Sequence, residues 1–447
     1  MLYPGHANPR PHRSLALGWI RDFAPLLRRG PRCGAGALRA SAHRSPSRRH
    51  PWRVAGLIAA GGLLAACGSG AAAEPTWVPQ QSISLEGGAR PGSSSQQPSP
   101  GPGGSGGPGQ PGGTAPGSGA SPTGGNGSGS GVLAKHLTAP TGLALLPNGS
   151  ALVGERTTGR ILRVQPRADQ PVPVVRTLPG LATSGDGGLL DLALSPTYSQ
   201  DGLIYAYITT PTDNRVIDFT MTGPTAPVLT GIPRGATGNT GRLAFDGRGR
   251  LYIGTGDAGQ PQLAANPTSL AGKVLRVNGI GHPAAGNPKA GSAVFASGQH
   301  TVNGLCANVA SGIVYETEAP AEVNVIRAGA NYGWPTPHRT SQGPASTLPA
   351  KRAGAAGCAV QQGVLFVATT TGKSLMAARI GQQQKVGAFS VVPLDEPLGR
   401  LRTVVAAPDG ALWVTTTNKD GNGHPTSDDE RVVRIIPTPS GGDAPPV

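Results

Sequence analysis

Four polar side chains in the second half of the chain have the types that proton transfer and anion binding require: Asp257, His300, Arg400 and Arg402. A carboxylate beside an imidazole can help it take a proton from a hydroxyl group, and paired arginines can hold a carboxylate or phosphate. Arg400 and Arg402 are two residues apart on a predicted strand, so we expect them to point the same way. Each residue also has an ordinary interpretation, as a turn aspartate, a solvated histidine or surface arginines. Convergence on one cavity would distinguish a site from these alternatives.

Asp257 follows the clearest structural unit of the chain, the segment 238–259. An apolar run at 243–245 enters a turn of sequence Asp-Gly-Arg-Gly at 246–249, and a β-rich run at 251–254 leaves it. This pattern predicts a β-hairpin whose far end carries Asp257.

Variants of this hairpin recur at intervals of roughly 40 to 60 residues, and each copy offers about four short strands. The copies begin near residues 141, 187, 241, 303, 363 and 401, and the fifth has lost its turn signal. Such repeats favour a propeller over a solenoid, no helical period competes, and a sandwich would not explain the recurrence. The sequence therefore predicts an all-β, six-bladed β-propeller over residues 132–437, with a disordered tail at 438–447.

Residues 1–66 form a basic leader that ends in an export signal. Arginines precede a short apolar segment at 54–63, and the sequence Leu-Ala-Ala-Cys follows at 64–67. This arrangement is typical of a secretory signal peptide, and its end resembles a bacterial lipobox, in which the cysteine becomes the lipid-modified first residue. The alternative is a transmembrane anchor or buried helix, but the apolar run is too short to span a bilayer comfortably. We therefore expect a lipoprotein with a palmitate-type lipid anchor at Cys67, held in the cell membrane on the extracytoplasmic face of the envelope.

The leader is long for such a signal, which leaves open a translation start downstream of Met1. After it, residues 67–131 form a Gly/Ser/Pro-rich tract that cannot bury apolar surface, so we expect a disordered tether. The formal charge of +15 belongs mostly to the leader, because eleven arginines against Asp22 alone place ten of these charges before Cys67. The basicity therefore does not indicate a nucleic-acid partner, and we expect none.

The cysteines lack the CxxC spacing typical of metal sites. Cys306 and Cys358 lie in the fourth and fifth repeats of an exported domain, where a disulfide between them is expected. Two separate buried thiols are the alternative.

Several segments, taken together and in this order, resemble the soluble pyrroloquinoline quinone (PQQ) dependent glucose and sorbosone dehydrogenases. They are residues 155–164, 187–190, 241–243 followed by 256–257, 272–277 and 329–335. The resemblance covers nearly all of the predicted propeller. It implies a PQQ cofactor over one end of the central channel, held by calcium and basic side chains. It also implies an oxidoreductase that acts on CH–OH groups of sugars, in which a base takes the hydroxyl proton and the quinone accepts the hydride.

The resemblance places the family's catalytic residues at two positions of this chain. The base, a histidine just before Gly-Arg-Leu, falls on Gly238, and the aspartate that orients it falls on Asp257. Glycine cannot accept a proton from substrate. His300 is the residue that could replace the missing base.

The family's cofactor contacts are only partly present. Arg400 and Arg402 match paired arginines near the quinone carboxylates, and a late lysine falls on Thr371, with Lys373 two residues away. Asp186 is expected in the same loop layer. The family's Gly-His-Arg-Asn segment corresponds to residues 298–301, where its arginine and asparagine are replaced, and the calcium loop looks shortened to residues 316–322. Metal ligands therefore stay unassigned.

Two functions follow from this sequence. The first is a PQQ-type sugar dehydrogenase tethered to the cell envelope. The second is a propeller that keeps the scaffold without the chemistry and binds an envelope glycan, a lipid head group or a protein partner. The glycine at position 238 leaves the choice between enzyme and binding protein open.

Overall fold

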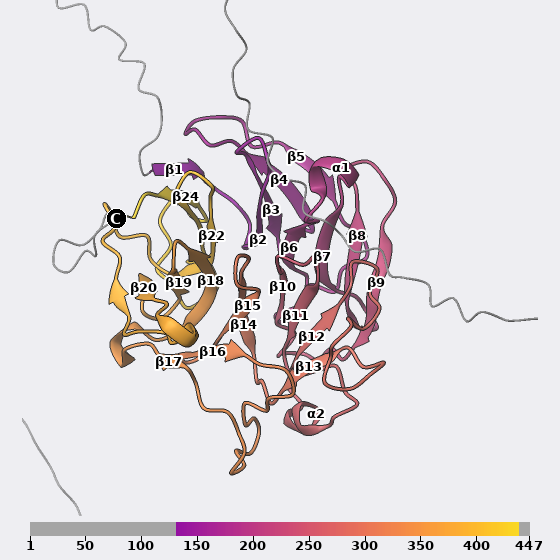
Figure 1. Cartoon of the computed structure of the whole chain (residues 1–447). Coiled ribbons are helices and arrows are strands. Elements are labelled where there is room, and N and C mark those ends of the chain that lie inside the picture. Colours follow the sequence, from indigo (N-terminus) through magenta and orange to yellow (C-terminus); the bar gives the residue numbers. More distant parts are fainter. Residues whose placement is uncertain (1–130, 438–447) are drawn as a thin grey trace, which may run out of the picture. The chain divides into compact units, whose positions relative to one another are not determined.

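A computed structural model describes residues 131–437, which form six four-stranded antiparallel sheets. The sheets are arranged around a central axis as the blades of a propeller (Figure 1). The predicted all-β, six-bladed fold is confirmed. The leader, the tether with Cys67 and the tail lie outside the described residues.

Five of the six blades each consist of four strands that are neighbours in sequence, and the sixth combines three such strands with β1 from the start of the domain. The strands of each blade are given below from the channel outward. Blade 1 contains β2 (Pro140–Leu145), β3 (Ala151–Glu155), β4 (Arg160–Val164) and β5 (Val174–Thr177). Blade 2 contains β6 (Leu189–Leu194), β7 (Ile204–Thr209), β8 (Asn214–Phe219) and β9 (Ala226–Ile232). Blade 3 contains β10 (Gly241–Phe245), β11 (Leu251–Thr255), β12 (Lys273–Val277) and β13 (Val294–Ser297). Blade 4 contains β14 (Val302–Asn308), β15 (Ile313–Glu318), β16 (Glu322–Ile326) and β17 (Ser346–Thr347). Blade 5 contains β18 (Ala355–Gln361), β19 (Val364–Thr369), β20 (Leu375–Arg379) and β21 (Ser390–Val391). Blade 6 contains β22 (Leu401–Ala406), β23 (Leu412–Thr416), β24 (Val432–Ile435) and β1 (Gly131–Ala134).

Helical structure in this part of the chain is confined to short connections. They are α1 (Tyr198–Asp201), α2 (Pro261–Ala265) and two 3-10 turns at Ala350–Arg352 and Gln382–Gln384. Within residues 131–437 no helix is long and apolar enough to cross a bilayer.

The first described strand, β1, is the outermost strand of the last blade. It pairs antiparallel with β24, with Gly131 opposite Arg434. This pairing joins the two ends of the domain and closes the ring. The repeat pattern did not predict it, because the two strands are separated by almost the whole domain.

The predicted turns owe their shape to one local device. Asn148, Asp246 and Asp409 each accept, through Oδ1, a hydrogen bond from the backbone N–H two residues on, at 3.1, 2.9 and 3.1 Å. The residue after each is a glycine, and at Asp246 the turn ends at Gly249 with a φ of 72°. Short polar side chains that close such turns explain why the hairpins could be recognised in the sequence.

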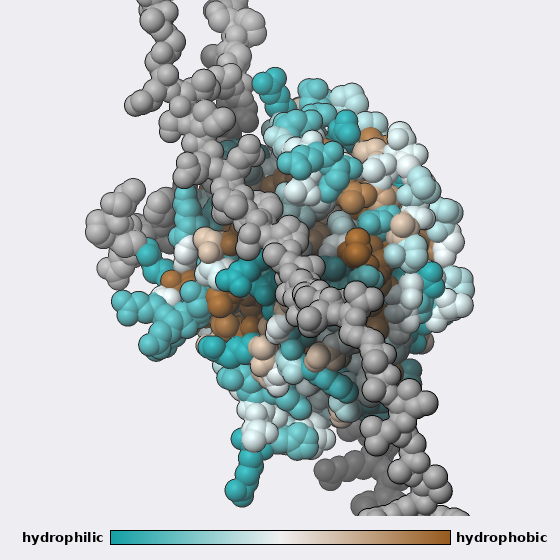
Figure 2. Space-filling view, turned by 45° about the vertical axis from the view of Figure 1, so that its right-hand side comes forward, coloured by the Kyte–Doolittle hydropathy of each residue, from teal (hydrophilic) through white to brown (hydrophobic). Residues whose placement is uncertain are grey.

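Apolar side chains fill the spaces between neighbouring blades. Trp413 packs with Val153 between blades 6 and 1, and Tyr207 packs with Ile253 between blades 2 and 3. The face in Figure 2 is mostly polar, and hydrophobic residues show there only in patches. The core is therefore a ring of layers between sheets, each of which needs both of its blades.

One buried arginine links the inner strands across the axis. Arg242 of blade 3 donates Nε–H to the carbonyl of Asn303 in blade 4 at 2.7 Å. Its Nη1 donates to the carbonyl of Thr141 in blade 1 at 3.3 Å and to Oγ1 of Thr403 in blade 6 at 3.2 Å. The same nitrogen lies 3.7 Å from Oδ1 of Asp191 in blade 2. A single guanidinium thus contacts four of the other five blades.

We call Arg242 and the four residues that it contacts the hub. Breaking the hub should destabilise the whole propeller. We expect Asp191→Asn and Arg242→Met each to lower the free energy of unfolding by about 3 kcal/mol or more, because either change leaves a buried charge unpaired. The double variant should lose clearly less than the two single losses added, since it buries neither charge. Urea denaturation of the purified proteins measures all three values, and strictly additive losses would contradict the coupling.

Candidate functional site

The predicted site residues all belong to one end of the central channel, which we call the upper end. Inner and second strands are antiparallel, so each inner strand begins where the second strand ends; in blade 3, Gly241 pairs with Thr255. Loops that precede inner strands and loops that follow second strands therefore share this end. These positions include Asp186, Gly238, His300, Arg400 and Arg402 at inner strands, and Asp257 and Lys373 after second strands.

Asp257 and His300 come together between blades 3 and 4. Oδ2 of the buried Asp257 lies 3.9 Å from Nε2 of His300. Trp334 donates its Nε1–H to the same oxygen at 3.0 Å, and its ring stacks on the imidazole with centroids 4.2 Å apart. The His300 side chain remains 44% exposed. A carboxylate, an indole and an accessible imidazole thus form one cluster.

Gly238 lies directly against this carboxylate. A Cβ at this position would lie 2.8 Å from Oδ1 of Asp257 and 2.5 Å from the backbone nitrogen of Gly259. The φ of Gly238 is 72°, a conformation that side-chain-bearing residues rarely adopt. A histidine could not be placed here without moving the backbone.

Asp186 ties the loop of blade 2 to the loop that contains Gly238. Its Oδ2 accepts the N–H of Gly238 at 2.7 Å, and its Oδ1 accepts Nδ2–H of Asn239 at 2.6 Å. The carboxylate is therefore engaged by protein groups. Its observed role is to hold the segment beside Asp257.

Arg400 and Arg402 do not share a partner. Arg400 donates from Nε and Nη2 to Oδ2 of Asp420 at 3.0 and 2.8 Å. The side chain of Arg402 has no hydrogen bond or ion pair within the described part of the chain. The pairing register of β22 with β23 shifts between Leu401 and Thr403, which places Arg402 at an irregularity of the strand.

The half-buried Arg402 lies among other charges at the upper end. Burial lowers its pKa to about 9; Arg242 and Arg156 lower it further, while Asp191 and Asp186 act in the opposite direction. Burial also raises the pKa of Asp191 to about 6 against the effect of Arg242. Arg402 is thus a cation with no bonded anion, a suitable partner for an anionic ligand.

Lys373 makes no contact with the other site residues of the upper end. It is exposed in the turn between β19 and β20, with a φ of 50°, and has no hydrogen bond or ion pair among residues 131–437.

The predicted calcium loop contains carboxylates that the protein itself uses. Oε1 of Glu318 accepts the backbone N–H of Thr301 at 2.8 Å and that of His300. Glu316 is fully buried, and its Oε2 accepts Nδ2–H of Asn324 at 2.8 Å. Residues 131–437 contain no group of three or more His, Cys, Asp or Glu side chains arranged to hold a metal.

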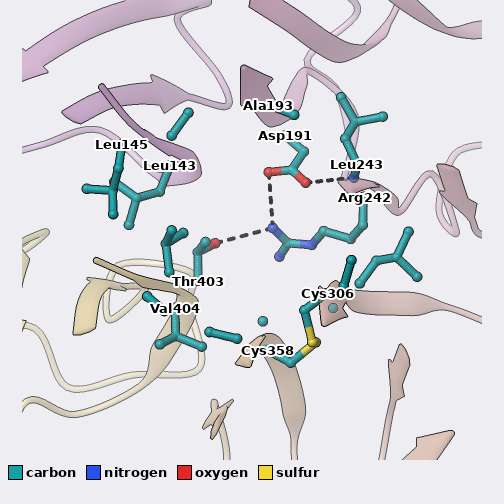
Figure 3. A pocket seen from close by; sticks show the side chains of 18 of the residues that line it. Leu143, Leu145, Asp191, Ala193, Arg242, Leu243, Cys306, Cys358, Thr403 and Val404 are labelled. Carbon is teal, nitrogen blue, oxygen red and sulfur yellow. Dashed lines mark hydrogen bonds and ion pairs between the residues drawn. A yellow bond between two sulfur atoms is a disulfide. The ribbon is translucent and has the colours of Figure 1, made fainter. Parts of the chain in front are cut away.

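Below the hub lies a cavity of about 470 Å³, shown in Figure 3. Arg242, Asp191 and Thr403 form its polar part, and leucine, valine and alanine side chains of the inner strands form most of the rest. The predicted disulfide is present in its wall: Cys306 and Cys358 join β14 to β18, with Cα atoms 5.7 Å apart. The bridge fastens blade 4 to blade 5 at the channel.

The fold is a six-bladed propeller, and the candidate site residues lie in loops at one end of its channel. Residues 137–356 match the family model described as glucose/sorbosone dehydrogenase. An aldose sugar dehydrogenase from Streptomyces coelicolor, solved in its PQQ-bound form, is 34% identical over 68% of this chain and 95% of its own, with a TM-score of 0.64. The chain belongs to the glucose/sorbosone dehydrogenase family.

Other relatives agree with this assignment. A Thermus thermophilus structure described as a putative oxidoreductase (glucose dehydrogenase) is 31% identical over 68% of this chain and 98% of its own, with a TM-score of 0.62. The quinoprotein glucose dehydrogenase B of Acinetobacter calcoaceticus is 28% identical over 46% of this chain and 52% of its own length.

Sequence reasoning assigned no role to Arg242, Asp191 or Trp334. A signal was available for the first two, since each is a charge inside an otherwise apolar inner strand. Trp334 gave no such signal, because its contact with Asp257 joins residues 77 positions apart.

Glu318 should make stability depend on pH near neutrality. Burial is the main cause that raises its pKa from 4.5 to about 7, with Glu322 and Asp257 adding to the shift. The folded state therefore holds this proton where the unfolded state has lost it, so the stabilisation is complete below pH 4.5 and is lost as pH rises through 7.

As the pH rises from 4.5 to above 7, the free energy of unfolding should fall by roughly 1–3 kcal/mol more in the wild type than in Glu318→Gln. Denaturant titrations at a series of pH values measure the difference. Asp395→Asn, which removes an exposed carboxyl, is the control and should follow the wild type. Identical pH slopes for Glu318→Gln and the wild type would contradict the assignment.

Proposed function

We propose that this propeller is a quinone-dependent oxidoreductase for the CH–OH groups of sugars, in which His300, paired with Asp257, is the proton acceptor. The observation that carries the proposal is the cluster of Asp257, His300 and Trp334, with Oδ2 of Asp257 3.9 Å from Nε2 of His300. The family places its base before β10. Here the only imidazole beside Asp257 in the described chain comes from the loop before β14.

The pair has the properties that a base needs. The exposed imidazole can be reached by a hydroxyl group, and Nε2 can take its proton. The buried carboxylate then stabilises the imidazolium. Stacking on Trp334 limits rotation of the ring, and the indole N–H fixes the carboxylate oxygen that faces it.

The residues present fit an anionic cofactor at one point. Arg402 would hold a carboxylate of PQQ, because it is an unpaired cation at the upper end. Bound there, PQQ would supply the acceptor for the two electrons and the hydride hydrogen leaving the sugar carbon. Asp186 relates this position to the base: its charge raises the pKa of Arg402, and its carboxylate accepts the N–H of Gly238, which lies against Asp257.

One observation favours the second function, a propeller that binds without catalysis. Asp420 neutralises Arg400, so only one of the two expected anion-binding arginines is free. The partner would then be an envelope glycan, a lipid head group or a protein. Cofactor titration separates the two proposals.

The enzymatic proposal predicts that purified protein binds PQQ in the presence of calcium and then reduces a dye with an aldose. Arg402→Met should weaken PQQ binding roughly 10- to 100-fold, through loss of a hydrogen bond to a charged group. His300→Gln should lower kcat on the order of 100-fold or more while PQQ still binds. Calorimetry measures the first effect and dye reduction the second.

His338→Gln, a change at an exposed loop histidine, is the matched control and should behave as the wild type. Absence of PQQ binding in calorimetry would exclude the enzymatic proposal and leave the binding function. Full activity in His300→Gln would show that another residue is the base.

We also propose that the mature chain is anchored to the extracytoplasmic face of the cell membrane by lipid on Cys67. The sequence at 64–67 and the small-residue tether after it support the proposal. Cys67→Ala should move the protein from the membrane to the soluble fraction and remove labelling by radioactive palmitate. Cys33→Ala is the control, and unchanged palmitate labelling in Cys67→Ala would contradict the anchor.

A further inference from the structure

Lys273, the first residue of β12, is a buried cation without a carboxylate partner. Its side chain has no exposed surface. Nζ donates hydrogen bonds to the backbone carbonyls of Leu263 at 3.0 Å, Ala264 at 2.8 Å and Ala271 at 2.9 Å. Burying a charge is costly unless its hydrogen-bonding capacity is met, and these three carbonyls meet it.

The three carbonyls belong to the loop of residues 256–272, which begins beside Asp257 and contains α2. This helix has five residues and buries only Ala264, so it is too short to be stable on its own. The loop closes at its base, where the N–H of Gly272 donates to the carbonyl of Gly256 at 2.8 Å. Nζ of Lys273 binds the carbonyls of Leu263 and Ala264 in α2 and that of Ala271 near the end of the loop.

Both ends of this loop hold the segment that carries His300. The N–H of Asp257 donates to the carbonyl of His300 at 3.0 Å, and the N–H of Gln299 donates to the carbonyl of Gly272 at 3.3 Å. Backbone hydrogen bonds at the base of the loop that Lys273 fills therefore join the segments of Asp257 and His300.

We propose that Lys273 is a positioning residue for the Asp257–His300 pair. It holds α2 and the end of the loop against β12, and through the base of the loop it sets where the carboxylate meets the imidazole and the Trp334 indole. It lies inside the loop, and the groups it bonds are backbone carbonyls. The catalytic meaning of this role rests on the proposed function; the positioning itself does not.

The test uses Lys273→Met in cofactor-free protein. Methionine has similar length and removes the buried charge together with its three hydrogen bonds, so the carbonyls of Leu263, Ala264 and Ala271 lose this donor. We expect the amides of Leu263, Asn266 and Gly272 to exchange with solvent roughly tenfold faster or more. The indole N–H signal of Trp334, assigned by its loss in Trp334→Phe, should shift in the nuclear magnetic resonance spectrum as its bond to Asp257 is disturbed.

Two controls separate positioning from general destabilisation. Lys289→Met removes an exposed lysine from another loop of blade 3, and Val164→Ala makes a cavity in the core of blade 1. Both should leave the Trp334 signal in place. If Lys273→Met does not fold, Lys273→Gln, which keeps amide donors at similar length, should show the same changes to a smaller degree.

A folded Lys273 variant with an unchanged Trp334 signal and unchanged loop exchange would overturn the proposal. These readouts need neither PQQ nor sugar, so they can succeed even if the enzymatic proposal fails. In active protein, Lys273→Met should lower kcat by on the order of 10- to 100-fold with little change in KM, since misplacing the pair disturbs the proton transfer more than sugar binding.

Discussion

The propeller depends on the guanidinium of Arg242, which lies on the axis where the inner strands meet. Its bonds reach Asn303, Thr141 and Thr403, and its charge faces Asp191. Apolar layers between sheets hold each blade to its neighbours, but only a long side chain with several donors can join blades across the channel. The hub also divides the channel, with an apolar cavity below and the charged upper end above. It therefore shapes both the scaffold and the site.

With the scaffold held at the axis, the upper loops can differ without disturbing the blades. At position 238 glycine packs against Asp257 where the family has a histidine, and His300 approaches the same carboxylate from the next blade. In the proposed function this loop supplies the base, because proton transfer needs an imidazole at the right place, whichever segment carries it. The two arginines of the upper end also differ in their partners. Arg400 forms an ion pair with Asp420, whereas the side chain of Arg402 has none among the described residues.

The segments that could be predicted are those with local causes. Asp246 and the glycines after it make a turn wherever they occur, and alternating apolar residues make strands on either side, so the six repeats could be counted from the sequence. The inner strand of blade 5 escaped recognition because its turn lacks the Asp-Gly or Asn-Gly signal. The pairing of β1 with β24 escaped because no local pattern marks a partner so far away.

The sequence by itself determined the fold class and the set of chemically capable residues, because those follow from residue type and periodicity. It left the cysteines with two possible states, and the structure decided for the bridge between Cys306 and Cys358. Only the tertiary structure decided how the chemically capable residues combine. It brought His300 to Asp257, engaged Asp186 with a neighbouring loop and left Lys373 alone. It also gave Arg400 the partner Asp420, which Arg402 does not share. Contacts between blades depend on loop conformations and strand register, and neither is encoded in any one repeat.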